Sequence, residues 1–406
     1  MNAENTTRSV SPRVIKEINV FLIQSCIYKK GPISRIDIAA ETNSSVPTVS
    51  RAVDVLLKKN IVKTVGIIKS TGAGRKAELI DFNYSYGSVI GLHIQEQHIE
   101  IALCDLKGRI IQKGEIPLAH DKDSFLSSIL DLINGVLKNK SAGKLLTVSV
   151  ACPGLVDFKS GKIERSIDIP LLKELLLKEE LESHYNVPVC IDNDVNIASL
   201  GEYSFYKTKN IHNLAYIEFG PGIGAGVIIN GELYRGHGSG AGELGYCLFD
   251  EADLYEDHLD KGSFSESINL NAVEGEIRKI AEAEYPALSG APYQLLLSKI
   301  LEMYTGGDAR ACALVDGVID RIAMAVCNYS CVLNPELIVI DGDFVNAWGE
   351  ILLKKVRRAL EMSYPLVPEI KTTRSGLSSK LVGAIEIALN DAAGILNLHG
   401  VSFYIN

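Results

Sequence analysis

The sequence has few of the features that are typical of secreted proteins, membrane proteins or proteins stabilised by a bound metal. Its 406 residues include eight cysteines, and no two of them form a CxxC pair. No apolar run approaches the length of a membrane span, and the first ten residues, MNAENTTRSV, contain no apolar segment typical of a signal peptide. Scattered cysteines, several of them inside apolar runs, indicate reduced thiols. We therefore expect a cytoplasmic protein with no membrane segment.

The charge is distributed unevenly along the chain. Hydrophobic residues make up 47% and charged residues 22%, as in globular proteins, and the length suggests two or three domains. The formal net charge is −9, yet residues 1–86 contain 13 Lys+Arg against 7 Asp+Glu, whereas the remaining 320 residues contain 28 against 43. A basic N-terminal segment (the head, within residues 1–86) followed by an acidic body indicates that only the head binds a polyanion.

The basic head has the pattern of a helix-turn-helix. Apolar positions at helical spacing predict a first helix over residues 12–28. Ser34, followed three residues later by Asp37, predicts the start of a short second helix. Ser45 predicts the cap of a third helix, whose apolar stripe leaves a polar face of Ser, Thr and Arg residues exposed. In this arrangement the helix after the turn enters the major groove of DNA.

The next segment has the pattern of a wing. Residues 61–65 and 77–82 read as two strands, and the loop between them carries basic residues. A basic hairpin tip beside a helix-turn-helix is placed to contact phosphates or the minor groove. The alternative is a small three-helix bundle with a solvated charged loop. The residues predicted to contact DNA are Arg35, Ser45, Thr48, Ser50, Arg51, Gly74, Arg75 and Lys76.

The acidic body has an α/β pattern that begins twice. Three strand-like runs, SVIGLHI, IEIALCDL and RIIQKGEIPL, precede alternating helices and strands, and a similar order starts again at Leu214. We therefore expect two similar α/β lobes with a ligand cleft between them, at the carboxyl ends of the strands. The predicted domains are residues 1–83 (head), 84–212 (first lobe) and 213–406 (second lobe).

Two polar segments fall where such a cleft is expected. In IDNDVNIASLGE, residues 191–202, two carboxylates and two amides crowd a step from strand to helix. We expect one of them to cap the helix and another to face the cleft, as a general base toward a hydroxyl or as an acceptor of hydrogen bonds from a polyol. In GAGELGY, residues 240–246, glycines flank Glu243. The alternative there is a flexible loop with a solvated glutamate.

Together these segments resemble the ROK family of bacterial repressors and sugar kinases, in particular its winged-helix repressors. The likeness rests on GPISRIDIAAETNSSVPTVSRAVDVLLKKNIV, TGAGRKAELIDFN, CPGLVDFKSG, DNDVNIASLGE, GPGIGAGVIINGELYRGHGSGAGELGY and LNPELIVIDGD. The resemblance implies an α/β fold with an N-terminal winged helix-turn-helix followed by a two-lobed, actin-like (ribonuclease-H-type) body. It also implies sugar contacts by Asn193, Asp194, Glu243, Tyr246 and Glu266.

Departures from the family pattern bear on activity. The family's kinases open the body with an Asp and a Gly-Gly-Thr turn, where this chain has His93 and then Gln95-Glu96-Gln97. A Gly-Gly-Gly follows the late strand in kinases, where this chain has Asp341-Gly342-Asp343. Acidic groups at both places repel ATP. Tyr246 replaces the family's zinc-binding His and DLYEDHLDKGSFSE replaces its cysteine cluster, so we expect no zinc.

These observations predict a sugar-responsive transcriptional regulator, a repressor of carbohydrate-utilisation genes, with no catalytic residues, cofactor or metal. Its expected partners are double-stranded operator DNA, a sugar or sugar derivative, and a second copy of the chain in a homodimer or a tetramer, with the dimer surface on the second lobe. The alternative is an ATP-dependent ROK sugar kinase with an appended DNA-binding head. A third possibility is an architectural DNA-binding protein without a ligand.

Overall fold

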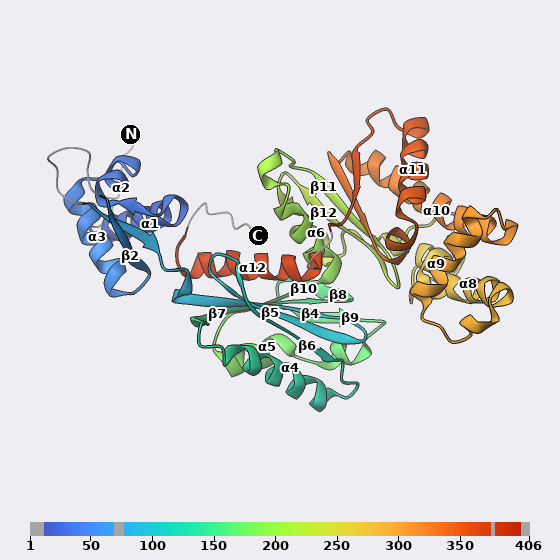
Figure 1. The fold of residues 1–406 in the computed structure, drawn as a ribbon, viewed down its shortest axis with the longest axis horizontal. Coiled ribbons are helices and arrows are strands. Elements are labelled where there is room, and N and C mark those ends of the chain that lie inside the picture. Colours follow the sequence, from blue (N-terminus) through green and yellow to red (C-terminus); the bar gives the residue numbers. More distant parts are fainter. Residues whose placement is uncertain (1–11, 69–76, 375–377, 399–406) are drawn as a thin grey trace, which may run out of the picture.

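The structure, a computed structural model, describes residues 12–68, 77–374 and 378–398, which form a head and two α/β lobes (Figure 1). The elements of the head are α1 (Pro12–Lys30), β1 (Ile33–Ser34), α2 (Arg35–Glu41), α3 (Val46–Lys58), β2 (Val62–Ile68) and β3 (Ala77–Phe82). Strand β3 lies between β1 and β2 and pairs antiparallel with both.

The start of each short helix in the head is fixed by a serine. The hydroxyl of Ser34 accepts a hydrogen bond from the backbone N–H of Asp37 and donates one to its carboxylate, at 3.2 and 2.6 Å. Ser45 caps α3 by accepting a bond from the N–H of Thr48 at 3.4 Å. Because a cap satisfies N–H groups that have no partner within the helix, these residues set where α2 and α3 begin. The predicted winged helix-turn-helix is confirmed.

The two lobes have the same strand order. The first lobe contains β4 (Gly87–Ile94), β5 (His98–Asp105), β6 (Ile110–Pro117), α4 (Lys122–Leu137), β7 (Lys144–Cys152), β8 (Leu155–Asp157), β9 (Lys162–Arg165), α5 (Leu177–Tyr185), β10 (Val189–Asn193) and α6 (Asp194–Ser204). Its main sheet has the order β10-β7-β4-β5-β6. Strand β4 pairs antiparallel with β5 and parallel with β7.

The second lobe repeats this arrangement with larger helices. It contains β11 (Leu214–Phe219), β12 (Ile223–Ile229), β13 (Glu232–Leu233), α7 (Ser263–Ile268), α8 (Leu270–Glu284), α9 (Tyr293–Thr305), α10 (Ala309–Leu333), β14 (Leu337–Asp341), α11 (Asp343–Ser363), β15 (Glu369–Thr372) and α12 (Ser379–Ile395). The sheet order β13-β12-β11-β14-β15 corresponds to the first lobe strand by strand, with β11 in the place of β4. The predicted duplication is therefore confirmed.

Short 3-10 helices join some of these elements: η1 (Tyr84–Tyr86), η2 (Pro170–Glu174), η3 (Lys207–Lys209), η4 (His237–Ser239), η5 (Leu244–Tyr246), η6 (Glu251–Tyr255) and η7 (Pro286–Leu288). None of the helices in the described residues has both the length and the apolar content needed to span a lipid bilayer.

Helices α6 and α12 cross between the two sheets. Helix α6 follows a strand of the first lobe, but it packs on β11 and β12 of the second. Helix α12 follows the last strand of the second lobe, but it covers β4 and β7 of the first, on the face opposite α4 and α5 (Figure 1). A division of the chain at residue 213 therefore separates α12 from the sheet that it covers.

Two glycines allow these helices to cross at very short range. A Cβ atom on Gly383 of α12 would lie 1.9 Å from the carbonyl oxygen of Ile197. A Cβ atom on Gly201 of α6 would lie 2.1 Å from the carbonyl oxygen of Ser379. No side chain fits at either place without moving backbone, so the two helices are in direct backbone contact, and the lobes are held together at this crossing.

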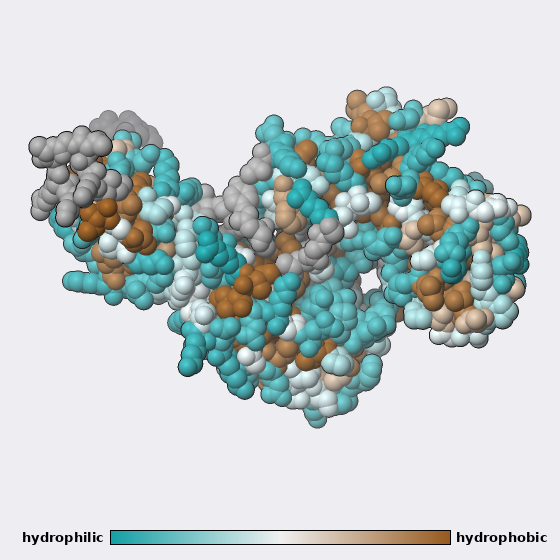
Figure 2. All heavy atoms as spheres, in the orientation of Figure 1, coloured by the Kyte–Doolittle hydropathy of each residue, from teal (hydrophilic) through white to brown (hydrophobic). Residues whose placement is uncertain are grey.

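The head packs against the first lobe and the end of α12. The side-chain amide of Gln24 on α1 donates a hydrogen bond to the carbonyl oxygen of Leu396 at 2.9 Å. The hydroxyl of Tyr28 donates one to the carbonyl oxygen of Leu106 at 3.0 Å. Apolar residues of the head, of β4 and β5, and of α12 form one continuous core. Hydrophilic residues cover much of the visible face of both lobes (Figure 2).

Candidate functional site

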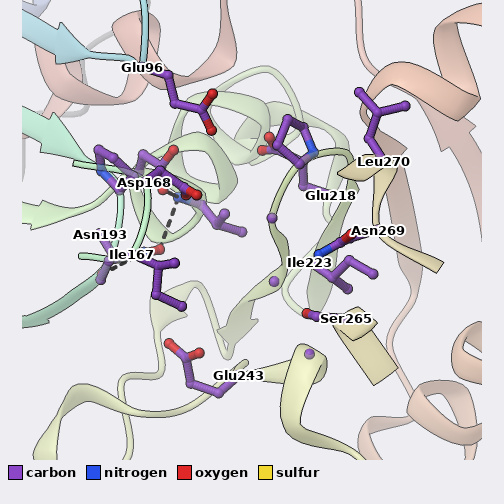
Figure 3. Close-up of a pocket in the computed structure, with 18 of the residues that line it drawn as sticks. Glu96, Ile167, Asp168, Asn193, Glu218, Ile223, Glu243, Ser265, Asn269 and Leu270 are labelled. Carbon is purple, nitrogen blue, oxygen red and sulfur yellow. Dashed lines mark hydrogen bonds between the residues drawn. The ribbon is translucent and has the colours of Figure 1, made fainter. Parts of the chain in front are cut away.

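A cavity of about 1080 Å³ lies between the two lobes. Its wall is built from the loop after β4, the step from β10 to α6, the β11–β12 loop, the segment around η5, and the first residues of α8, α11 and α12 (Figure 3). The five residues predicted to contact sugar all line it, although they come from both lobes: Asn193, Asp194, Glu243, Tyr246 and Glu266.

Asn193 fixes the edge of the cavity at the start of α6. Its side-chain oxygen accepts hydrogen bonds from the N–H groups of Val195 and Asn196, at 3.0 and 3.1 Å, and its side-chain nitrogen donates to the carbonyl oxygen of Gly154 at 2.9 Å. The cap places the next residue, Asp194, in the first turn of the helix, on the cavity wall. As expected from the sequence, one residue of this segment caps and its neighbour faces the cleft.

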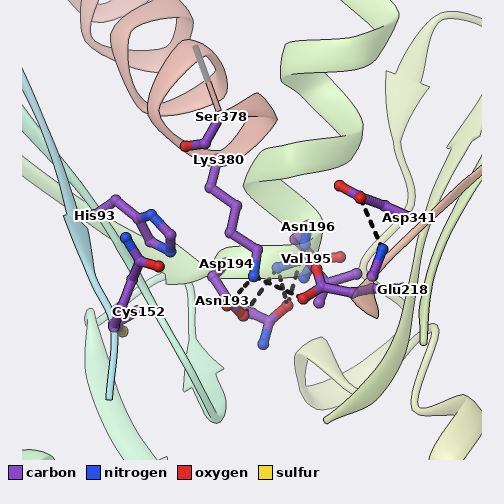
Figure 4. Close-up of polar contacts among 12 residues, drawn as sticks. His93, Cys152, Asn193, Asp194, Val195, Asn196, Glu218, Asp341, Ser378 and Lys380 are labelled. Carbon is purple, nitrogen blue, oxygen red and sulfur yellow. Dashed lines mark hydrogen bonds and ion pairs between the residues drawn. The ribbon is translucent and has the colours of Figure 1, made fainter. Parts of the chain in front are cut away.

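The buried Asp194 forms a charged triad with two partly buried residues that sequence reasoning missed. The ammonium group of Lys380, from α12, lies 3.0 Å from Asp194 Oδ2 and 2.8 Å from Glu218 Oε1 of β11 (Figure 4). Burial by itself would raise the pKa of Asp194, but the positive charge of Lys380, together with His93, lowers it below its usual value. The triad joins α6, α12 and the second-lobe sheet at the inner end of the cavity.

Glu243 faces the cavity from a loop whose shape requires glycine. Gly242 has a φ of +90°, and a Cβ atom there would lie 1.7 Å from the carbonyl oxygen of Ala225. This close approach fixes the backbone immediately before Glu243, whose carboxylate points into the cavity (Figure 3). Desolvation, and then the negative charge of Asp194, raise the pKa of Glu243. The glycine-flanked glutamate is therefore held in place and is not part of a loose loop.

Tyr246 and Glu266 bound the cavity near the loop that replaces the family's cysteine cluster. The hydroxyl of Tyr246 donates to the carbonyl oxygen of Leu259 at 3.3 Å, and Nδ1 of His258 lies 2.7 Å from Glu266 Oε2. These bonds tie the loop to the cavity wall through a histidine and a carboxylate. Residues 250–266 contain one histidine, His258, and no cysteine, and the cysteine nearest in sequence is Cys247. This loop therefore does not offer the four N or S ligands of a structural zinc site.

Within the described residues, one cluster of side chains has the chemistry of metal ligands. Ligand atoms of His98, Glu100 and Glu115, on strands β5 and β6, lie within 4.8 Å of one another. Glu115 is exposed, and Nε2 of His98 already lies 2.8 Å from the side-chain nitrogen of Gln95. The cluster is therefore partly satisfied within the protein.

A second ion pair joins a buried carboxylate to a partly exposed arginine next to the residues of the cavity wall. Arg235, which follows β13, contacts the fully buried Asp192 at 2.8 Å and stacks over the ring of Phe158 at 3.6 Å. Desolvation raises the pKa of Asp192, and the guanidinium group of Arg235 offsets part of that rise. Sequence reasoning named Asp192 as a polar candidate but gave no indication of Arg235, because the two are 43 positions apart.

Most of the sequence departures predicted to exclude nucleotide line the same cavity, and Glu96 lies across it from Glu243 (Figure 3). His93, the last but one residue of β4, is buried, and burial lowers its pKa. Asp341 accepts a hydrogen bond from the hydroxyl of Tyr216 at 2.7 Å, and Asp343 accepts one from that of Tyr293 at 2.6 Å. Asp343 begins α11, so a carboxylate already stands where the helix N-terminus would favour a phosphate.

The predicted DNA-contacting residues fall into three groups. Ser45, Thr48, Ser50 and Arg51 lie at the start of α3, and the guanidinium group of Arg51 is exposed. Arg35 is different, because its guanidinium group donates to the carbonyl oxygen of Ser50 at 2.9 Å and to Asp54 at 2.8 Å. It therefore holds α2 against α3. Gly74, Arg75 and Lys76 lie outside the described residues.

The fold combines a winged helix-turn-helix with a duplicated, actin-like α/β body that encloses a polar cavity. The chain belongs to the ROK family, whose sequence pattern matches residues 89–391, and a winged helix-turn-helix DNA-binding pattern matches residues 20–63. The family resemblance and the fold class expected from the sequence are thus confirmed.

Several known proteins are similar in sequence to this chain over most of its length. The xylose repressor of Caldicellulosiruptor bescii is 28% identical over 361 residues, covering 86% of this chain and 88% of that protein. The DNA-binding transcriptional dual regulator NagC of Escherichia coli K12 is 24% identical over 356 residues, covering 86% and 85%. The crystal structure of a ROK family transcriptional regulator, a homologue of the E. coli MLC protein, has a TM-score of 0.74 at 21% identity, covering 95% of this chain and 99% of that one.

Proposed function

We propose that this protein is a transcription repressor of carbohydrate-utilisation genes, which binds operator DNA through α3 and releases it when a sugar occupies the cavity between the lobes. The observation that carries the proposal is the joining of a DNA-binding head to a cavity lined by carboxylate and amide groups. Such groups accept and donate the hydrogen bonds that sugar hydroxyls need. Relatives named for xylose and for transcriptional regulation support it.

Helix α12 provides a physical route from the cavity to the head. Lys380, in its first turn, belongs to the cavity wall, and Leu396, just past its last turn, accepts the hydrogen bond from Gln24 of the head. A sugar that changes how Lys380 is held would bias the position of α12 and, through it, the head. Because an effector shifts an equilibrium only by its preference between two states, the sugar must bind better to the arrangement that fits DNA poorly.

The proposed assembly is a homodimer acting in the cytoplasm, where its DNA lies. Helix-turn-helix proteins commonly read two half-sites about one DNA turn, roughly 34 Å, apart, and two copies of α3 would meet that requirement. A change in the spacing of the two α3 helices is then sufficient for release. Sedimentation of the protein with and without its selected DNA tests this assembly.

Arg51→Ala is expected to weaken operator binding by roughly 5- to 150-fold, the equivalent of about 1–3 kcal/mol for a lost base contact. The reason is that Arg51 is exposed at the start of α3, where, among the described residues, its guanidinium group hydrogen-bonds only to the carbonyl oxygen of Pro47 on its own helix. The measurement is the affinity for DNA selected by the wild-type protein from a random pool, at fixed salt.

Lys58→Ala is the matched control, since it removes one positive charge from the other end of α3, where the side chain is exposed. It should reduce affinity only slightly and equally for all sequences. Equal losses in the two variants would contradict the assignment of α3 as the reading helix.

A sugar kinase is the second candidate, and the charged triad of Asp194, Glu218 and Lys380 argues against it. A general base must be free to accept a proton from a sugar hydroxyl, whereas Asp194 is paired with Lys380 and has a lowered pKa. Asp341 and Asp343 add negative charge near the place expected for nucleotide phosphates.

We therefore expect no sugar-dependent hydrolysis of magnesium-ATP above background. The measurement is ATP turnover by the purified protein with each sugar that stabilises it. Turnover that disappears in the Asp194→Asn variant would contradict this expectation and favour the kinase.

A further inference from the structure

The cavity wall carries a large excess of negative charge. Among the described residues, its lining contains eight carboxylates and three basic side chains. The basic residues are Arg165, Lys261 and Lys380. In a partly desolvated cleft such an excess acts on a ligand more strongly than it would in open water.

Two of the three basic groups are already bonded within the protein. Lys380 is held between Asp194 and Glu218, at 3.0 and 2.8 Å. The guanidinium group of Arg165 donates to the carbonyl oxygen of Asp260 at 2.7 Å and lies 3.3 Å from its carboxylate. Arg165 and Lys261 also line a smaller neighbouring recess, so both stand at the margin of the main cavity.

Three carboxylates face the cavity and, among the described residues, form neither an ion pair nor a side-chain hydrogen bond: Glu96, Asp168 and Glu243 (Figure 3). Desolvation raises the pKa of each of them, and neighbouring carboxylates raise it further. Holding these groups ionised is therefore already unfavourable. A phosphate dianion beside them would add to the repulsion, whereas a hydroxyl group would donate hydrogen bonds to them.

The helix N-termini at the cavity, which would otherwise attract an anion, are occupied by the protein's own side chains. Asn193 caps α6, and Asn269 caps α8 by accepting from the N–H of Ala272 at 2.7 Å. Asp343 stands in the first turn of α11, and Ser378 caps α12. The positive ends of these helices are thus already matched by an acceptor or a negative charge.

We infer that the ligand of this cavity is an unphosphorylated sugar, recognised through its hydroxyl groups by an acidic wall that rejects sugar phosphates. This inference rests on the proposed function and narrows it to one chemical class of effector. The carboxylates select against a phosphate by repulsion, in the same way that like charges at an interface reject a wrong partner.

The test compares neutral sugars with their own phosphate monoesters. A panel of mono- and disaccharides that includes D-xylose and N-acetylglucosamine is titrated against the full-length protein, each beside its ester, by calorimetry and by release of selected DNA. We expect at least one neutral sugar to bind and its ester to bind about 100-fold more weakly or worse. Tighter binding of an ester would overturn the inference and leave a sugar-phosphate-responsive repressor. No binding by any member would reject both the inference and the proposed function.

A charge-neutralising variant tests the physical cause. In Glu96→Gln/Asp168→Asn the affinity for the ester is expected to rise at least about tenfold relative to that for the neutral sugar, because two repelling charges are removed. The control, Asp123→Asn/Glu179→Gln, removes two exposed carboxylates from α4 and α5, on the far face of the first lobe. An unchanged preference in the cavity variant, or an equal change in the control, would contradict the electrostatic cause. Thermal denaturation establishes that both variants are folded.

Discussion

Replacing Glu243 by alanine should leave operator affinity unchanged and raise the sugar concentration needed for release by roughly 5- to 150-fold. The estimate corresponds to about 1–3 kcal/mol for a sugar hydroxyl that loses its buried acceptor. Glu243 suits this experiment because it faces the cavity and forms no ion pair with any described residue, so its removal leaves none of their cations without a partner. It also lies in the second lobe, outside the head that contacts DNA.

Asp194 is a less direct target for the same test. Replacing it by alanine would leave Lys380 with Glu218 as its remaining carboxylate partner, and breaking a buried charge pair destabilises a protein. Asp194→Asn keeps the shape and a hydrogen-bond acceptor. We expect it to reduce the sugar response together with some thermal stability, whereas Glu243→Ala should affect the response alone.

The measurement for Glu243 is operator affinity across a titration of the sugar that binds the wild-type protein. Glu232→Ala is the control, because Glu232 is an exposed carboxylate on β13 that does not line the cavity. Release of DNA at the same sugar concentration in wild type and Glu243→Ala would place the effector site elsewhere.

Gly383→Ala should lower the free energy of unfolding by about 1–3 kcal/mol, the usual cost of forcing an extra group into a packed core. The added Cβ atom would lie 1.9 Å from the carbonyl oxygen of Ile197, so α12 and α6 must separate to admit it. Since α12 also contacts the head through Leu396, we expect the sugar response to change as well. Thermal and denaturant unfolding give the first effect, and DNA release gives the second.

Gly394→Ala is a matched control in the same helix. Gly394 is exposed, and a Cβ atom there meets nothing within 4 Å. Alanine is the better helix former, by about 1 kcal/mol in an exposed helix interior, so this variant should be neutral or slightly more stable. If Gly383→Ala were as stable as Gly394→Ala, α6 and α12 would not be in direct backbone contact at their crossing.

Signals confined to a few neighbouring residues were sufficient to predict much of this protein. Ser34 and Ser45 marked the starts of α2 and α3, because a capping hydroxyl acts on N–H groups two or three residues away. The strand pattern that starts again at Leu214 marked β11, and the polar step at Asn193 and Asp194 marked both a helix cap and the cavity wall. The resemblance to the ROK family supplied the five lining residues, which the fold then brought to one cavity.

The charged contacts of the site were decided by tertiary structure alone. Nothing near Lys380 in the sequence indicates that it lies between Asp194 and Glu218, residues 186 and 162 positions away. The sequence predicts that Arg35 contacts DNA, yet its guanidinium group donates hydrogen bonds to Ser50 and Asp54. In both cases the partner belongs to another element, and only folding sets the distance between them.

The place of α12 shows the same limit. Chain order assigns it to the second lobe, but its buried face covers the first-lobe sheet. The sequence by itself determined the local elements, their order and the chemistry of the cavity wall, because caps, periodicity and side-chain types act over a few residues. The tertiary structure decided which sheet α12 covers and which charges meet, because both depend on contacts between segments far apart in the chain.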